Sequence, residues 1–149
     1  MALSSIRKYA IHTVLVLAAL AIVIWPRLER KLDPAKTEAG RQATLHFLQM
    51  VDQDRFAESW TMSAQVLREK LPQDKWADKL RLHRAQCGKF IKRQEKKVDY
   101  ATEASGEVKG EFYTFKFAAD YERCPGVTET VTVMLEDDGH WRVGGFFVE

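Results

Sequence analysis

The sequence predicts an α+β domain, in which three helices pack on a curved antiparallel sheet of about four strands, behind an N-terminal transmembrane helix. Three observations indicate this. Residues 9–25 carry no charged side chain. Apolar residues between Ala39 and Cys87 recur at helical spacing, and apolar residues after Gly88 alternate with polar ones, which is typical of half-buried strands. With 149 residues in total, the chain has room for one small domain besides the apolar segment.

The apolar segment begins at Tyr9 and ends at Trp25, whose amphipathic rings favour the headgroup level of a bilayer. As a helix it spans roughly 26 Å, which just crosses a hydrocarbon core of about 30 Å. We expect an uncleaved signal-anchor. The alternatives are a cleaved secretory signal, because Ala19-Leu20-Ala21 has the small-residue pattern of a cleavage site, and a buried core helix, which the lack of a polar face disfavours.

Residues 1–31 are predicted to form this anchor with a short linker, and residues 32–149 one domain. The first part holds five of the 23 basic side chains and one of the 21 acidic ones, so the domain carries a charge of about −2 and no nucleic-acid partner is expected.

Two basic residues precede the helix and five follow it closely, which by itself favours a cytoplasmic domain. However, long C-terminal domains are translocated largely regardless of such charges. Since a short basic N-terminal tail normally stays inside, we expect the domain outside the cytoplasm.

The first predicted helix, near residues 35–52, starts where Asp33 can cap free N–H groups and Pro34 occupies the first turn. A second apolar stripe follows, and a third lies between Pro72, which begins a helix, and Gly88, which ends it. The three stripes are Ala39, Ala43, Phe47, Met50 and Val51; Phe56, Trp60, Ala64, Leu67 and Leu71; and Trp76, Leu80, His83 and Cys87.

Four strands are expected from the alternation that follows. The first is the least regular, because four basic side chains crowd it. A hairpin turn at residues 137–139 joins the last two strands, and Gly144-Gly145 suits a bulge or sharp bend in the final one. The predicted strands are residues 90–101, 111–121, 127–135 and 140–148.

Both cysteines lie at predicted element ends. Cys87 precedes Gly88 at the end of a helix, and Cys124 lies in a turn at residues 123–126. A bond between them would contribute about 3–4 kcal/mol in the chain-entropy model. The alternative is two unrelated thiols; their spacing matches neither a CxxC redox motif nor a zinc site.

A widely spaced set of residues runs in one characteristic order through the domain. The set is Val51-Asp52, Phe56-Ala57-Glu58-Ser59-Trp60, Trp76, Arg84, Gly88, Arg93, Glu129-Thr130-Val131, Asp138-Gly139-His140-Trp141-Arg142-Val143 and Gly145-Phe146. With it, the chain resembles the bacterial domain of unknown function 4019 family over roughly residues 38–149. The resemblance implies a small secreted or membrane-anchored protein with a cone-shaped fold similar to that of nuclear transport factor, in the cystatin-like class. The resemblance implies no catalytic residues, and the fold alone does not determine a function. Neither cysteine belongs to the family pattern, which favours a disulfide between Cys87 and Cys124.

A candidate ligand pocket combines aromatic walls with charged groups at its mouth. The residues are Trp60, Trp76, Arg84, Arg93, Glu129 and Trp141. Aromatic residues at helical or strand spacing are usually core residues, so the alternative is that the tryptophans only fill the domain. Arg93 and Glu129 are expected to pair across strands; an anionic ligand held by the planar fork of Arg93 is the alternative.

No catalytic residue is predicted. An isomerase-like or dehydratase-like enzyme would need a base inside the cone. His83 lies in the apolar stripe of the third helix, where a lone histidine is usually a core residue. The four histidines of the chain show no ligand spacing, so no metal is expected, and no nucleotide-binding motif indicates a cofactor.

Basic residues concentrate in residues 79–97, which hold eight basic side chains and one acid, whereas residues 99–138 hold ten acids and three bases. Such segments usually form solvated faces. The alternative is a patch for a protein partner or anionic lipid headgroups, made by Lys92, Arg93, Lys96 and Lys97.

These features favour an uncharacterised membrane-anchored accessory or binding protein, non-enzymatic, with a single pass through the bacterial inner membrane and a periplasmic domain. We expect it to bind a partner or small ligand on the concave side of the sheet. The alternative is a small cone-fold enzyme, isomerase-like or dehydratase-like, that acts on an apolar substrate. The sequence leaves the ligand, the pathway and the oligomeric state open.

Overall fold

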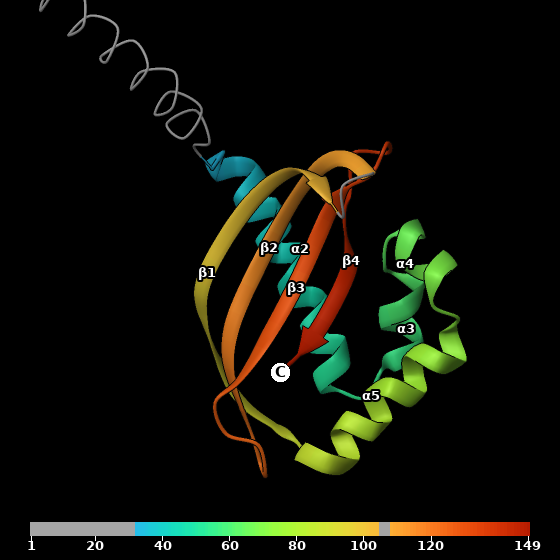
Figure 1. Ribbon diagram of the computed structural model, residues 1–149, viewed down its shortest axis with the longest axis vertical. Helices are drawn as coiled ribbons and strands as arrows, with labels where there is room; N and C mark the ends of the chain where they lie inside the picture. Colours follow the sequence, from blue (N-terminus) through green and yellow to red (C-terminus); the bar gives the residue numbers. More distant parts are fainter. Residues whose placement is uncertain (1–31, 105–107) are drawn as a thin grey trace, which may run out of the picture. The chain divides into compact units, whose positions relative to one another are not determined.

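The fold is seen over residues 32–104 and 108–149, which are the residues that this computed structural model describes. From Asp33 onward they belong to one compact unit, Asp33–Glu149, in which the helices precede the strands (Figure 1). The elements are α2 (Pro34–Asp52), α3 (Phe56–Thr61), α4 (Gln65–Lys70), α5 (Gln73–Cys87), β1 (Phe90–Ala104), β2 (Val108–Tyr121), β3 (Val127–Leu135) and β4 (Trp141–Val148). The predicted α+β class with four antiparallel strands is confirmed.

The membrane helix expected over residues 9–25 lies outside the described residues. Among the helices of residues 32–104 and 108–149, none combines the length and the apolar character that a bilayer crossing requires. The longest helix that we describe, α2, has 19 residues and buries only one side.

α2 begins as the sequence predicts. A carboxylate oxygen of Asp33 accepts hydrogen bonds from the backbone N–H groups of Ala35 and Lys36 at 2.9 and 3.1 Å, and proline occupies the first turn. Farther along, Gly40 allows a close approach to the sheet, because a Cβ atom there would lie 3.3 Å from the side chain of Val133. The helix therefore packs directly on the strands.

The second predicted helix, over the stripe at residues 56–71, is wrong as a single element, because the structure divides it into α3 and α4. The hydroxyl of Ser63 donates to the carbonyl of Ser59 at 2.7 Å, and the next residue, Ala64, turns to an extended conformation. Its backbone N–H donates to the carbonyl of Val143 in β4 at 2.8 Å. The break thus depends on a tertiary hydrogen bond, which local periodicity does not show.

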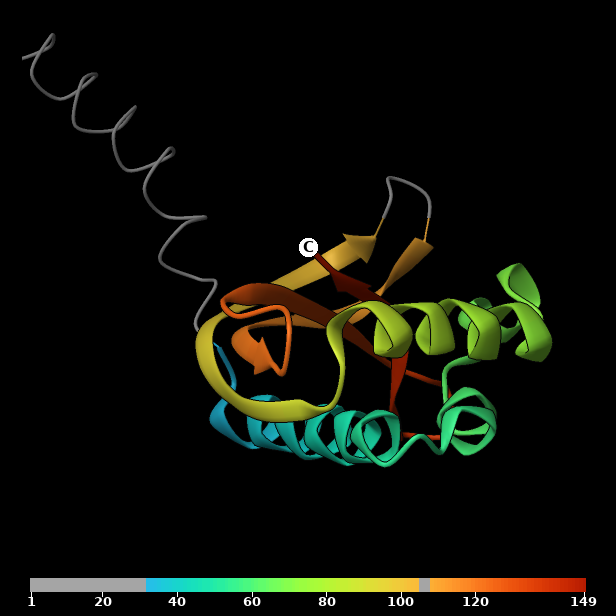
Figure 2. The same cartoon turned by 90° about the horizontal axis from the view of Figure 1, so that it is seen from below.

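α5 has the predicted ends. It starts directly after Pro72 and stops at Gly88, whose φ of 79° lies in the left-handed region that favours glycine. Figure 2 shows from below how the α3–α4 segment connects the end of α2 to the start of α5.

The strands form one sheet in the order β1-β2-β3-β4, each antiparallel to the next. β1 extends to Ala104 rather than ending at residue 101, because β2 pairs with it over its length. As an edge strand it accommodates the many lysines, since charged side chains at an edge discourage pairing with another chain.

The sheet has an inner face, which α2 covers, and an outer face. In Figure 1, α2 crosses behind the strands, α3 and α4 lie beyond β4, and α5 runs from there to below the lower ends of the strands, where it leads into β1. Alternate residues of β2 and β3 point to the inner face and pack with the apolar side of α2. The buried residues of this core include Phe47, Leu48, Met50, Val51, Tyr113, Phe115, Phe117, Val131 and Val133.

The predicted bulge in the last strand is confirmed. Thr132 of β3 pairs with Gly145 and the next residue, Val133, pairs with Val143, so Gly144 is an extra residue in β4. The bulge interrupts the sheet register at the place where α4 lies against β4.

Candidate functional site

The tryptophans of the predicted pocket occupy separate places in the core. Trp76 is 2% exposed, and its ring centre lies 5.9 Å from that of Phe47. Trp60 and Trp141 pack against the core from its margin, the second with its ring 5.1 Å from that of Tyr113. This arrangement is the core packing that the sequence analysis kept as the alternative.

Four polar residues, three from the inner face of the sheet and one from the end of α2, form a connected set of hydrogen bonds, here called the Arg93 cluster: Arg93, Glu129, Tyr121 and Asp52. Arg93 in β1 donates to both carboxylate oxygens of Asp52, at 2.6 and 2.8 Å, and to both of Glu129, at 2.8 and 3.1 Å. The Tyr121 hydroxyl also donates to Glu129, at 2.5 Å. Arg93 stands opposite Ala119, whose small side chain lets the guanidinium reach across β2 to β3. The cluster thus contains the expected cross-strand ion pair and adds Asp52 from the end of α2.

The Arg93 cluster is largely closed to solvent. Glu129 is 0% exposed, and the side chains of Arg93 and Asp52 are 12% and 16% exposed. Burial by itself lowers the pKa of Arg93, but its hydrogen bonds to Asp52 and Glu129 raise that pKa well above the ordinary value, so the guanidinium remains charged. Burial, together with the nearby Glu129, raises the pKa of Tyr121 and keeps its hydroxyl a donor. Both edges of the Arg93 fork are used within the protein, which suits an internal brace better than capture of an anionic ligand.

Arg84 also has internal partners. Its guanidinium donates to Asp54 at 2.8 Å and to the carbonyls of Val51 and Asp52, at the C-terminus of α2, at 3.0 and 3.1 Å. It donates to the carbonyl of Gly88 at 3.1 Å as well. A cation is favourable beside the free carbonyls of a helix C-terminus. Arg84 therefore joins α2 to α5.

His83 in α5 lines a small hollow of about 70 Å³. Its Nε2 is buried and has no hydrogen-bond partner among the described residues, and its ring meets that of Tyr121 edge-on at 4.9 Å. The hollow has room for no more than about two water molecules, at about 30 Å³ each. Sites for small-molecule substrates are usually about 300–1,000 Å³, so this hollow does not accommodate one. The other lining residues are Trp76, Lys79, Leu80, Phe146 and Val148.

Protonation of His83 is expected to destabilise the fold. Burial, and secondly the positive charge of Arg84, lower the pKa of His83 below its ordinary value of 6.5. The unfolded chain therefore takes up this proton at a higher pH than the folded one. The contribution of neutral His83 to the free energy of unfolding is complete above pH 6.5 and decreases as the pH falls below that value. Urea unfolding between pH 8 and pH 5 measures this decline, which should be smaller in His83→Gln.

The matched control for that prediction is His46→Gln, because His46 is exposed on α2. We expect this variant to keep the wild-type dependence on pH. Equal pH dependence in His83→Gln and the wild type would contradict the assignment of the effect to His83.

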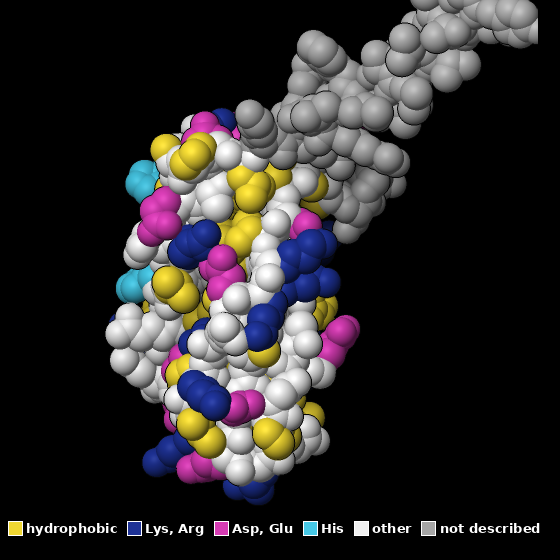
Figure 3. Space-filling model, turned by 90° about the vertical axis from the view of Figure 1, so that its left-hand side faces the viewer, with side chains coloured by type: hydrophobic (Ala, Val, Ile, Leu, Met, Phe, Trp, Pro, Cys, Tyr) yellow, Lys and Arg dark blue, Asp and Glu magenta, His cyan; other side chains and the backbone are white. Residues whose placement is uncertain are grey.

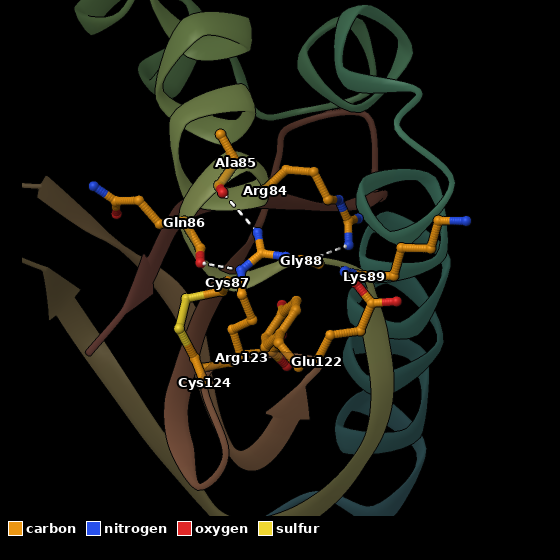
Figure 4. The surroundings of a disulfide bond; sticks show 11 residues. Arg84, Ala85, Gln86, Cys87, Gly88, Lys89, Glu122, Arg123 and Cys124 are labelled. Carbon is orange, nitrogen blue, oxygen red and sulfur yellow. Dashed lines mark hydrogen bonds between the residues drawn. A yellow bond between two sulfur atoms is a disulfide. The ribbon is translucent and has the colours of Figure 1, made fainter.

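Cys87 and Cys124 form a disulfide bond, with their Cα atoms 5.0 Å apart and 37 positions apart in the sequence. The bond joins the end of α5 to the turn between β2 and β3. Figure 4 shows Arg123 beside it, donating to the carbonyls of Ala85 and Gln86 at 2.7 and 2.9 Å. The turn therefore caps the last carbonyls of α5 in addition to holding the helix covalently.

The four residues of the predicted basic patch divide into two groups. Arg93 is committed to its cluster, whereas Lys92, Lys96 and Lys97 are exposed. Lys92 and Lys97 each form an ion pair with an aspartate, at 3.3 and 2.8 Å. Figure 3 shows this side of the molecule, where acidic side chains lie among the basic ones.

A groove of about 450 Å³ on the outer face was not predicted from the sequence. It lies between α4 and the sheet, over the bulge at Gly144 and Gly145. The two glycines were the only sign of it, because the groove also requires α4 to lie over that part of β4. Its lining residues are Val66, Lys70, Glu103, Ala104, Val108, Phe112, Thr114, Thr132, Met134, Gly144, Gly145 and Phe147.

Within residues 32–104 and 108–149, no three side chains of His, Cys, Asp or Glu are grouped so that they could hold a metal ion. A comparison with curated proteins finds no match to the chain. A family model does match, over residues 43–146, and its description is protein of unknown function (DUF4019). The match confirms the resemblance seen in the sequence, and the chain belongs to this family.

Proposed function

We propose that this protein is a membrane-tethered accessory or binding protein, whose domain has the cone-shaped architecture of nuclear transport factor, lies in the bacterial periplasm and catalyses no reaction. The apolar residues 9–25 supply the tether in this proposal. The exposed Lys92, Lys96 and Lys97 offer contacts to anionic lipid headgroups or to a protein partner.

The disulfide bond is the single observation that carries the proposed location. Disulfides persist in oxidising compartments such as the periplasm and are rare in the bacterial cytosol. The chain contains two cysteines, and Cys87 and Cys124 are bonded to each other. Together with an apolar N-terminal segment, this bond supports a domain on the outer side of the membrane.

The inner face favours a structural role over catalysis. The carboxylates of Asp52 and Glu129 are bonded to Arg93, and so are not placed to act as a general base on a substrate. The alternative is a small enzyme that acts on an apolar substrate. The buried Nε2 of His83, which has no described partner, favours that alternative, but the hollow beside it holds only about 70 Å³.

A thiol-labelling experiment in intact cells tests the location. The cells are treated with a membrane-impermeant maleimide, with or without prior reduction by an impermeant phosphine. We expect labelling only after reduction, because the two cysteines are bonded and outside the cytoplasm. In Cys87→Ala, the partly exposed Cys124 should react without reduction.

The double variant Cys87→Ala/Cys124→Ala is the control for labelling of other proteins. Labelling of the wild type only after cell lysis, with no need of reduction, would place the domain in the cytoplasm and refute the proposed location.

A further inference from the structure

The groove between α4 and the outer face is a feature that neither the core nor the Arg93 cluster explains. Its volume of about 450 Å³ is typical of sites for one small molecule. From α4 come Val66 and Lys70, which lie one helical turn apart and so share a side of the helix. From the ends of β1 and β2 come Glu103, Ala104 and Val108.

The floor of the groove is bare because the bulge consists of glycines. A bulge directs two successive residues to the same face. Cβ atoms built on Gly144 and Gly145 would lie 3.5 Å from Met134 and from Phe147, respectively, both on the outer face. Neither glycine has a positive φ, so the backbone does not require glycine here. The missing side chains provide space, which a larger residue at either position would fill.

The floor suits a hydrocarbon chain. Phe112, Met134 and Phe147 are apolar, and the two hydroxyls, of Thr114 and Thr132, bond to each other at 3.1 Å. A peptide would bring backbone N–H and C=O groups that need partners. A hydrocarbon chain needs none, and it would cover Phe147, which is 55% exposed.

The groove is lined by one basic residue, Lys70 on α4, and one acidic residue, Glu103 on β1. Lys70 is exposed, and no ion pair joins it to an acidic side chain of the described residues. Glu103 stands opposite Lys109 in the pairing of β1 with β2, and no ion pair of the described residues includes it either. A single hydrocarbon chain that ends in a carboxylate complements the apolar floor and the cation on its α4 side.

The geometry points to a fatty-acid site on the outer face, in which one acyl chain lies over Gly144 and Gly145 beneath α4 and its carboxylate meets Lys70. This inference rests on the proposed binding function and names its ligand class. It also moves the binding surface from the inner face, where the sequence analysis expected it, to the outer face.

Photo-crosslinking of the full chain in maltoside micelles tests the site. The probe is palmitic acid that carries a diazirine in its chain, and the comparison probe is the corresponding fatty alcohol. We expect saturable crosslinks on peptides that contain residues 65–70 and 141–148, displaced by unlabelled palmitate. Gly145→Leu should weaken the apparent affinity about tenfold, because its side chain fills the groove.

Two further variants test whether weaker crosslinking results from misfolding rather than from a change in the groove. Thr128→Leu adds the same side chain on the outer face outside the groove and should crosslink as the wild type does. Lys70→Gln changes an exposed residue and should lower the affinity for the acid about twofold to fivefold, without changing that for the alcohol.

Crosslinks spread along the chain without saturation, or equal labelling of Gly145→Leu and Thr128→Leu, would overturn the site. The outcome is separate from that of the thiol labelling. If palmitate crosslinks in the groove but the thiol labelling places the domain in the cytoplasm, only the proposed location is refuted. If the labelling places the domain in the periplasm but these crosslinks are missing, only the proposed ligand is refuted.

Discussion

Loss of the Cys87–Cys124 bond is expected to lower the free energy of unfolding by about 3–4 kcal/mol. The bond closes a loop between positions 37 residues apart, and in the chain-entropy model a loop of this length restricts the unfolded chain by that amount. Small domains have a total stability of about 5–15 kcal/mol. The bond is therefore expected to supply a large part of the stability of this one.

Urea unfolding of the full chain in micelles, with and without a reductant, measures this effect. Cys87→Ala/Cys124→Ala should have the stability of the reduced wild type and should not respond to the reductant. Arg123→Ala is the matched control, because it removes the cap on α5 and leaves the bond intact. We expect it to cost about 1 kcal/mol, the net contribution of a typical hydrogen bond in a protein. If reduction lowers the free energy of unfolding by less than about 1 kcal/mol, this would contradict a stabilising role for the bond.

The parts of the fold that the sequence predicts well are those that local interactions determine. Asp33 begins α2 through hydrogen bonds to residues two and three positions away, and Gly88 ends α5 through its own backbone conformation. The division of the second helix escapes prediction because Ala64 bonds to Val143, which is far away in the sequence. Local periodicity contains no information about that partner.

The site shows the same limit. The pairing of Arg93 with Glu129 is predictable because opposite charges on neighbouring strands attract, but the participation of Asp52 depends on where the end of α2 packs. The meeting of Cys87 with Cys124 is expected only as one of two alternatives. The outer groove is not predictable, because it arises where α4 lies against a bulge in β4 and each element alone shows only half of it.

Replacement of Arg93 by methionine is expected to cost about 3–5 kcal/mol, which is typical when one partner of a buried ion pair is removed. The variant leaves Glu129, which is fully buried, with only the hydroxyl of Tyr121 as a described side-chain partner, and it leaves Asp52 without the arginine that holds the end of α2 to the sheet. Lys92→Met, one position earlier in β1, is the matched control. Lys92 is exposed, so its loss should change the stability by no more than about 0.5 kcal/mol.

A double variant separates the cost of a stranded charge from the cost of lost packing. Most of the penalty in Arg93→Met comes from a buried carboxylate without its cation, so the further change Glu129→Gln should recover part of it, because the amide carries no charge to be compensated. We expect the two changes to be non-additive by about 1–3 kcal/mol in urea unfolding, as is usual for residues in direct contact. Additive effects would mean that the pair does not act as a unit. A cost in Arg93→Met as small as that in Lys92→Met would mean that the cluster does not brace the fold, and the guanidinium would then again be a candidate for binding an anionic ligand on the inner face.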